Sequence, residues 1–217
     1  MSKSKMRKVL ESVLAMPYYK NHAAASGRVH NDPKHEDALE DTLIQNGYTR
    51  SQIRKVKKSL RDELLKTRDF PEMEDNSYIP QPCGKQDSPD FLVKSEGLLF
   101  FIECKSASGP TTAPMYNSAV PKSGYIYVFC CKKYDETTTY LGQDVLERDD
   151  QQLIEAHIEE ARRRDEELNN SLREGGHSHG IEYYTRPMMT HTKHGVCKDY
   201  FRHPRREQLE QNVLNYV

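Results

Sequence analysis

Residues 89–105 read PDFLVKSEGLLFFIECK, and this stretch decides the fold that we expect. Asp90 to Val93 is predicted to be a short strand, and Glu96-Gly97 a turn. Leu98 to Cys104 is then an almost uninterrupted apolar run, which is typical of a central strand buried on both faces. The stretch therefore predicts a β-hairpin in the middle of a sheet, with charged residues at its open end.

The elements around this hairpin indicate the fold class. Apolar spacing and capping residues predict helices at 3–15, at 35–45 and, strongly basic, from Thr49 or Ser51 to Thr67, with loops at 20–32 and 69–88. Further along we expect strands at 124–131, 137–141 and 181–185, a long charged helix at 143–173, a hairpin around His194-Gly195 and a helix at 204–215. This order predicts an α/β fold with a single mixed central β-sheet flanked by helices.

The length of 217 residues suits one domain. We expect an N-terminal helical part (1–68), a catalytic sheet core (78–142), a long helix (143–174) and a C-terminal hairpin and helix (175–217). No run approaches the roughly 20 apolar residues of a membrane span, and no apolar signal core follows the basic start. The five cysteines, odd in number and without a CxxC pair, fit reduced thiols and a cytoplasmic location.

Charge is balanced overall, with 32 basic and 33 acidic residues and a net charge of −1. This balance argues against non-specific coating of nucleic acid, although it leaves site-specific binding open. Charge is segregated locally, because residues 50–68 are rich in Lys and Arg while 144–167 are rich in Asp and Glu. The basic stretch is either a solvated helix face or a surface that approaches DNA.

Two carboxylates and a lysine converge at the open end of the hairpin. A turn at Glu96-Gly97 brings Asp90 back beside Glu103, and two like charges so close favour a cation between them. Mg²⁺ is the expected ion, with the backbone carbonyl of Cys104 as a further ligand. Glu103 and Lys105 are two residues apart in a strand and so share a face, where the lysine can orient a water and stabilise a phosphate.

These residues resemble the PD-(D/E)xK nuclease superfamily, with Ser88-Pro89-Asp90-Phe91-Leu92-Val93 followed by Phe100-Phe101-Ile102-Glu103-Cys104-Lys105-Ser106. The resemblance implies a restriction endonuclease-like core in which Asp90, Glu103 and Lys105 are catalytic. Family members often carry a glutamate on a helix before the sheet that reaches the metal. Glu36 matches that position best and Glu40 is the alternative, and both also fit a plain solvated helix face.

A second segment, Pro114-Met115-Tyr116-Asn117-Ser118 followed by Gly124-Tyr125-Ile126-Tyr127-Val128-Phe129, resembles the region after the catalytic lysine in many type II restriction endonucleases. The resemblance makes Asn117 a candidate for DNA contact, with a simple turn residue as the alternative. Lys85 and Gln86, just before the motif, and Lys193 near the C-terminus are further candidates on the DNA side.

The resemblance implies site-specific hydrolysis of double-stranded DNA at a short palindromic site, leaving 5′-phosphate and 3′-hydroxyl ends. Mg²⁺ is the expected cofactor, Mn²⁺ is expected to substitute, and Ca²⁺ to bind without supporting cleavage. Cutting both strands of a palindrome favours a homodimer. Two alternatives stay open: a junction resolvase or repair nuclease on the same core, and a non-catalytic DNA-binding module.

Histidines near the C-terminus raise the question of zinc. The set is His177, His179, His191, His194 and His203, with Cys197. No paired cysteine element accompanies them, so we expect no structural zinc.

Overall fold

The structure is a computed structural model, and it describes residues 4–25, 34–85, 87–117, 120–175, 180–191 and 199–217. One six-stranded sheet runs through it, in the order β1 (Thr49–Arg50), β2 (Ser77–Pro80), β3 (Phe91–Ser95), β4 (Leu98–Ala107), β5 (Tyr125–Cys131) and β6 (Glu136–Leu141). The pairs β1–β2 and β4–β5 are parallel and the other pairs are antiparallel. The expected α/β fold with one mixed sheet flanked by helices is therefore confirmed.

The predicted hairpin is β3 and β4, which pair in register from Ser95 and Leu98 back to Phe91 and Ile102. Both turn residues have positive φ, 52° at Glu96 and 80° at Gly97. This is the backbone of a two-residue hairpin turn whose twist matches that of the strands, and glycine takes it without strain. The turn therefore fixes the register at the open end of the hairpin.

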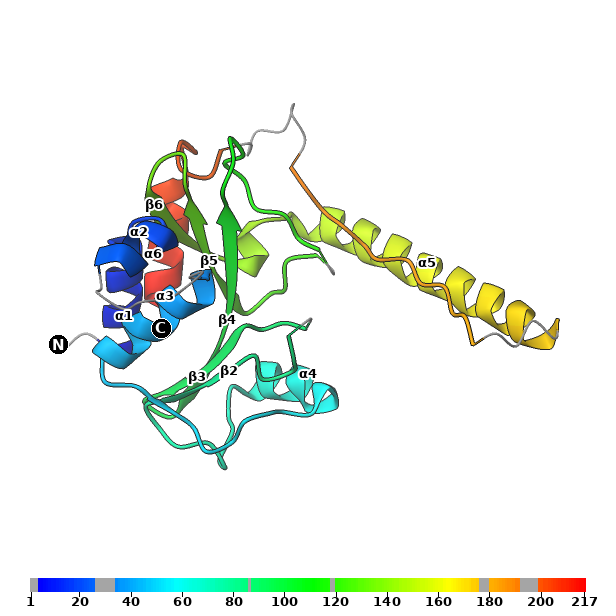
Figure 1. Ribbon diagram of the computed structural model, residues 1–217, viewed down its shortest axis with the longest axis horizontal. Coiled ribbons are helices and arrows are strands. Elements are labelled where there is room, and N and C mark those ends of the chain that lie inside the picture. Colours follow the sequence, from blue (N-terminus) through cyan, green and yellow to red (C-terminus); the bar gives the residue numbers. More distant parts are fainter. Residues whose placement is uncertain (1–3, 26–33, 86, 118–119, 176–179, 192–198) are drawn as a thin grey trace.

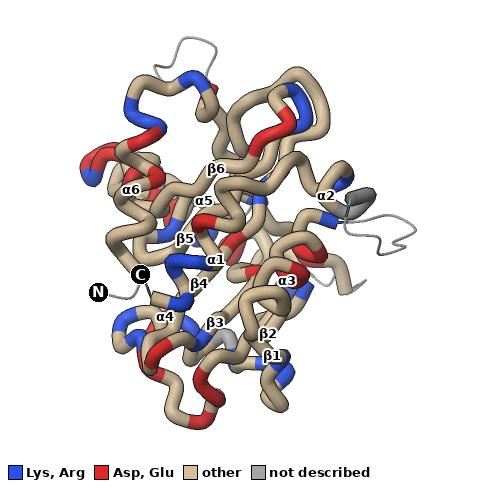
Figure 2. The backbone as a smooth tube through the Cα atoms, turned by 90° about the vertical axis from the view of Figure 1, so that its left-hand side faces the viewer, with Lys and Arg blue, Asp and Glu red and all other residues tan. Residues whose placement is uncertain are grey.

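Alternate residues of the central strands face two different layers. Phe100 and Ile102 pack into a layer of helices, whereas Leu99 and Phe101 pack on the opposite face. The helical layer holds α1 (Lys5–Leu14), α2 (Tyr19–Ala25), α3 (His35–Gln45) and α6 (Arg206–Tyr216), and α4 (Lys58–Thr67) lies on the other side (Figure 1). Acidic and basic residues are interspersed over the helical side (Figure 2).

A short turn of 3-10 helix, η1 (Gly142–Asp144), leads into α5 (Arg148–Glu174), which projects away from the sheet as an arm (Figure 1). Its 27 residues span about 40 Å, and none of its side chains is buried. Residues 180–190, called the strap below, run back along it. The side chains of Asp165 and Asn169 hold the strap through hydrogen bonds to Thr185 and Tyr183.

Four expectations about secondary structure are wrong. The basic helix begins only at Lys58, because the backbone N–H groups of Thr49 and Ser51 donate to the carbonyls of Asn76 and Tyr78 and make an edge strand beside β2 that local propensity does not show. The expected loop at 20–32 starts as helix α2, and the expected loop at 69–88 contains β2. The expected strand at 181–185 is part of the strap. The hairpin expected around His194-Gly195 lies outside the described residues.

Among the described residues, no helix combines the length and the apolar character needed to cross a bilayer.

Candidate active site

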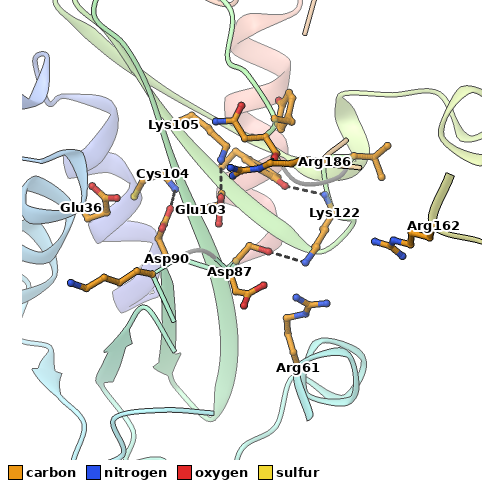
Figure 3. A pocket seen from close by; sticks show the side chains of 16 residues that line it. Glu36, Arg61, Asp87, Asp90, Glu103, Cys104, Lys105, Lys122, Arg162 and Arg186 are labelled. Atoms are coloured by element: carbon orange, nitrogen blue, oxygen red, sulfur yellow. Dashed lines mark hydrogen bonds and ion pairs between the residues drawn. The ribbon is translucent and has the colours of Figure 1, made fainter. Parts of the chain in front are cut away.

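The register of the hairpin brings Asp90 and Glu103 together at the open end of the sheet. Strand pairing ends at Phe91 and Ile102, so Asp90 lies one position further along, opposite Glu103. The Asp90 carboxylate Oδ2 accepts a hydrogen bond from the backbone N–H of Cys104 at 2.7 Å (Figure 3). The two carboxylates predicted to meet therefore share one site.

The pKa of Asp90 is raised to about 7 by burial, and then by the negative charge of Glu103. The N–H of Cys104 opposes this shift, Glu36 adds to it and Lys105 opposes it. In the absence of a cation, the protein therefore holds a proton on Asp90 up to near-neutral pH. A divalent ion at this place would oppose the shift, because its charge favours the ionised carboxylate.

Glu103 has one satisfied carboxylate oxygen and one unsatisfied one. Its Oε1 accepts from the ammonium of Lys105 at 2.7 Å, and both side chains are largely buried, with 13% and 20% exposed. Its Oε2 is buried and has no hydrogen-bond partner. A buried carboxylate oxygen without a donor is costly, and a bound cation is one way to satisfy it.

Cys104 contributes its backbone and not its thiol. The N–H and C=O of a residue in a β-strand point to the same side, so the Cys104 carbonyl also points towards the Asp90 side. The thiol packs against the helical layer, and burial raises its pKa well above the usual value. A thiolate at this position is therefore disfavoured, whereas the carbonyl fits a ligand role.

The structure separates the two candidate glutamates on α3. Glu40 accepts from Arg50 Nε at 3.1 Å and from the Tyr78 hydroxyl at 2.7 Å, so it is engaged with the edge of the sheet. Glu36 instead lines the same cavity as Asp90 and Glu103. No three His, Cys, Asp or Glu side chains of the described residues gather as a metal-binding group. Glu36 therefore flanks a pair of carboxylates.

These residues line a cavity of about 490 Å³. Five cations also line it: Arg61 from α4, Lys85, Lys122 from the loop before β5, Arg162 from α5 and Arg186 from the strap. Figure 3 shows Arg61, Lys122 and Arg162 on one side of the carboxylates, with Glu36 on the other. The cavity thus combines a pair of acids with a basic wall.

Of the residues predicted to contact DNA, two line the cavity and two lie outside the described residues. Lys85 and Asn117 line the cavity, and the carbonyl of Asn117 accepts from Arg186 Nε at 2.6 Å. Gln86 and Lys193 lie outside the described residues. Of the basic side chains at 50–68 that the structure describes, Arg61 alone lines this cavity.

Lys122 is a site residue that sequence reasoning missed. Its ammonium donates to Ser88 Oγ at 2.8 Å and lies 5.3 Å from the ring centre of Tyr125. Burial, and then the charge of Arg61, lower its pKa to about 8. Its position after Pro121 and just before a predicted strand was a weak signal, because many loops carry a lysine there.

His35, on the first turn of α3, is a second residue that the sequence did not single out. It is 4% exposed, and neither ring nitrogen has a hydrogen-bond partner. Burial is the main reason that its pKa is lowered to about 3; the charge of Lys105 acts in the same direction, and the backbone of Lys105 acts in the opposite one. The ring is therefore neutral and packs beneath the end of the strand that carries Lys105.

The histidines considered for zinc are only partly described. The ring of His191 is hydrogen-bonded to the Tyr200 hydroxyl at 2.9 Å, and His203 Nδ1 accepts from the backbone N–H of Arg205. His177, His179, His194 and Cys197 lie outside the described residues.

The donor set at the carboxylates fits a hard divalent cation. Asp90 and Glu103 supply oxygen ligands, the Cys104 carbonyl points to the same side, and the free Oε2 of Glu103 is available for coordination. Mg²⁺ prefers one or two carboxylates together with water and phosphate oxygens. The residues present are therefore sufficient for such an ion.

Comparison of the chain with protein-family models, with curated proteins and with solved structures finds no match.

Proposed function

We propose that this protein is a Mg²⁺-dependent endodeoxyribonuclease of the type II restriction kind, built on a restriction endonuclease-like core. One observation carries the proposal: Glu103 keeps a buried, partnerless carboxylate oxygen beside Asp90, whose pKa is raised, and Lys105 lies 2.7 Å from Glu103. A pair of carboxylates in need of a cation, next to a lysine and facing a basic wall, suits the hydrolysis of a phosphodiester.

In this proposal, Asp90, Glu103 and the Cys104 carbonyl hold the ion, with Glu36 at its edge. The chemistry that Mg²⁺ supplies when bound is the acidification of a water molecule and the neutralisation of phosphate charge. Lys105 orients the attacking water and stabilises the phosphate as the bond to the 3′ oxygen breaks. The ends produced would carry a 5′-phosphate and a 3′-hydroxyl.

The substrate in this proposal is double-stranded DNA with a short palindromic site, and the partner is a second copy of the chain, because two-fold symmetry in the DNA is matched by a dimer. Lys85 and Asn117 would lie against the DNA. The described cysteines are free thiols, which suits action in the reducing cytoplasm.

The proposal is tested by digesting a plasmid of known sequence with the purified protein in Mg²⁺, followed by sequencing of the ends. We expect discrete fragments whose ends share one short palindrome, Mn²⁺ in place of Mg²⁺ to support cleavage, and Ca²⁺ to support binding alone. Size-exclusion chromatography with light scattering would measure the oligomeric state.

The matched control is Glu166, an exposed acid on the arm. Glu103→Gln should abolish cleavage while Glu166→Gln keeps it, because only the first change removes a ligand of the ion. Equal cleavage by the two variants would refute the assignment. Cleavage of a four-way junction but not of the plasmid would favour a resolvase, and metal-independent binding without cleavage would favour a non-catalytic module.

A further inference from the structure

The cations that line the cavity form the basic wall, which is distinct from the carboxylate pair. Its five cations come from segments far apart in the sequence, and Asp87 is the acidic residue beside them. Positive charge is in excess along this part of the lining, and Arg61, Lys122 and Arg162 lie on the side of the carboxylate pair away from Glu36 (Figure 3). A ligand that spans the cavity therefore needs a negatively charged group next to these cations, in addition to the group that is held at the carboxylates.

Lys122 is held in place by its own backbone. Its N–H donates to the Tyr127 hydroxyl at 3.0 Å, and the N–H of Gly124 donates to Gln143 Oε1 at 3.0 Å. The carbonyl of Lys122 lies only 1.9 Å from where a Cβ would stand on Gly142, so the loop packs closely there because residue 142 has no side chain. The fold therefore fixes the backbone from which this lysine extends, and the hydrogen bond to Ser88 Oγ places its ammonium.

Lys122 and Arg61 line the same cavity and lie on the same side of the carboxylate pair (Figure 3), and the charge of Arg61 lowers the pKa of Lys122. Arg61 is only 15% exposed and pairs with its neighbour Asp62. Among the described residues, no carboxylate is within ion-pair distance of the Lys122 ammonium, so it is also separate from the Lys105–Glu103 pair. Two partly buried cations on the same side of one cavity favour an anion between them, as Asp90 and Glu103 favour a cation.

We propose that Lys122 and Arg61 form a subsite for a backbone phosphate of the bound DNA strand, beside the phosphate that is cut at Asp90 and Glu103. This inference rests on the proposed function, since it takes the ligand to be a nucleic acid. The subsite would position the strand: a charged donor on each neighbouring phosphate fixes its register on the carboxylate pair.

The test is the salt dependence of binding to a mixed-sequence DNA duplex in Ca²⁺, which needs no cleavage and no known target site. Each phosphate contact contributes about 0.9 to the slope of log affinity against log salt. Lys122→Met should lower the slope by about that amount and weaken binding about tenfold at moderate salt. Arg61→Gln, on a different element, should behave alike, and Lys122→Arg should restore the slope.

Lys132→Met is the matched control, because Lys132 is an exposed lysine at the opposite end of β5 and its loss removes the same charge. Wild-type slopes in both Lys122→Met and Arg61→Gln would overturn the subsite, and so would an equal loss in Lys132→Met. Plasmid cleavage assayed in parallel separates the two proposals. If the wild type cleaves the plasmid but both variants keep the wild-type salt slope, the phosphate subsite is refuted and the nuclease proposal stands. If the variants lower the slope but the wild type does not cleave, hydrolysis is refuted and the DNA-binding subsite stands. If the wild type does not bind DNA, both proposals are refuted.

Discussion

Replacing Asp90 with Asn should make the metal-free protein more stable while abolishing its proposed activity. The carboxyl of Asp90 is buried beside Glu103, and its pKa is raised to about 7 in the folded protein from 3.8 in the unfolded chain. The Asn side chain keeps an oxygen that can accept from the Cys104 N–H, but it has no charge to bury. The substitution therefore removes an electrostatic cost and keeps the hydrogen bond.

The direction and size of this change in stability follow from proton linkage. A raised carboxyl pKa means that the folded protein binds the proton more tightly, so stability is highest below pH 3.8, falls as pH rises to 7 and is level above that. The rise of the pKa from 3.8 to about 7 corresponds to about 4 kcal/mol. Asp90→Asn should recover a few kcal/mol of this at pH 8 and almost none at pH 4.

The assay is urea unfolding of both proteins in EDTA from pH 4 to pH 8.5. Saturating Mg²⁺ should narrow the difference at pH 8, because the ion stabilises the wild type and not the variant. Equal stability of the two proteins at pH 8, or a difference that does not change with pH, would refute the reasoning about the carboxylate pair.

Three further predictions follow. Lys105→Met should slow cleavage by about 10² to 10⁴ with unchanged DNA binding in Ca²⁺, as measured by single-turnover assays, and an equal loss of binding would contradict its role. Gly142→Ala places a Cβ 1.9 Å from the Lys122 carbonyl, so it should lower the salt slope of DNA binding as Lys122→Met does. His35→Leu should make the free energy of unfolding less dependent on pH in acid, because the unfolded histidine binds a proton below pH 6.5 whereas the folded one stays neutral down to about pH 3. The loss of unfolding free energy between pH 7 and pH 4.5, measured by urea titration, should be about 3 kcal/mol smaller in the variant.

The hairpin was predictable because its signals are local. The turn at Glu96-Gly97, the apolar run after it and the alternation of side chains fix which residues meet, so Asp90, Glu103 and Lys105 could be placed together from the sequence. The two strands after the hairpin, β5 and β6, and the long helix α5 were predictable for the same reason, since each has its own period and its own breakers.

The basic wall was not predictable in this way. Arg61 and Lys122 come from α4 and from the loop before β5, and only tertiary packing brings them to one cavity. Gly142 is an example: it lets the backbone of Lys122, twenty residues away in the sequence, pack closely against it, and no local pattern indicates that contact. The edge strand at Thr49–Arg50 was missed for a similar reason: its pairing with β2 overrides a helical local pattern.

The measurement that tests the nuclease proposal most directly is the single-turnover rate of supercoiled plasmid cleavage as Mg²⁺ is titrated, for the wild type, Glu103→Gln and Glu166→Gln. We expect a rate that rises with Mg²⁺ and saturates in the wild type and in Glu166→Gln, and that falls by about a thousandfold or more in Glu103→Gln. Cleavage that persists in EDTA, or that Glu103→Gln performs as fast as the wild type, would contradict a metal-dependent nuclease centred on Asp90 and Glu103.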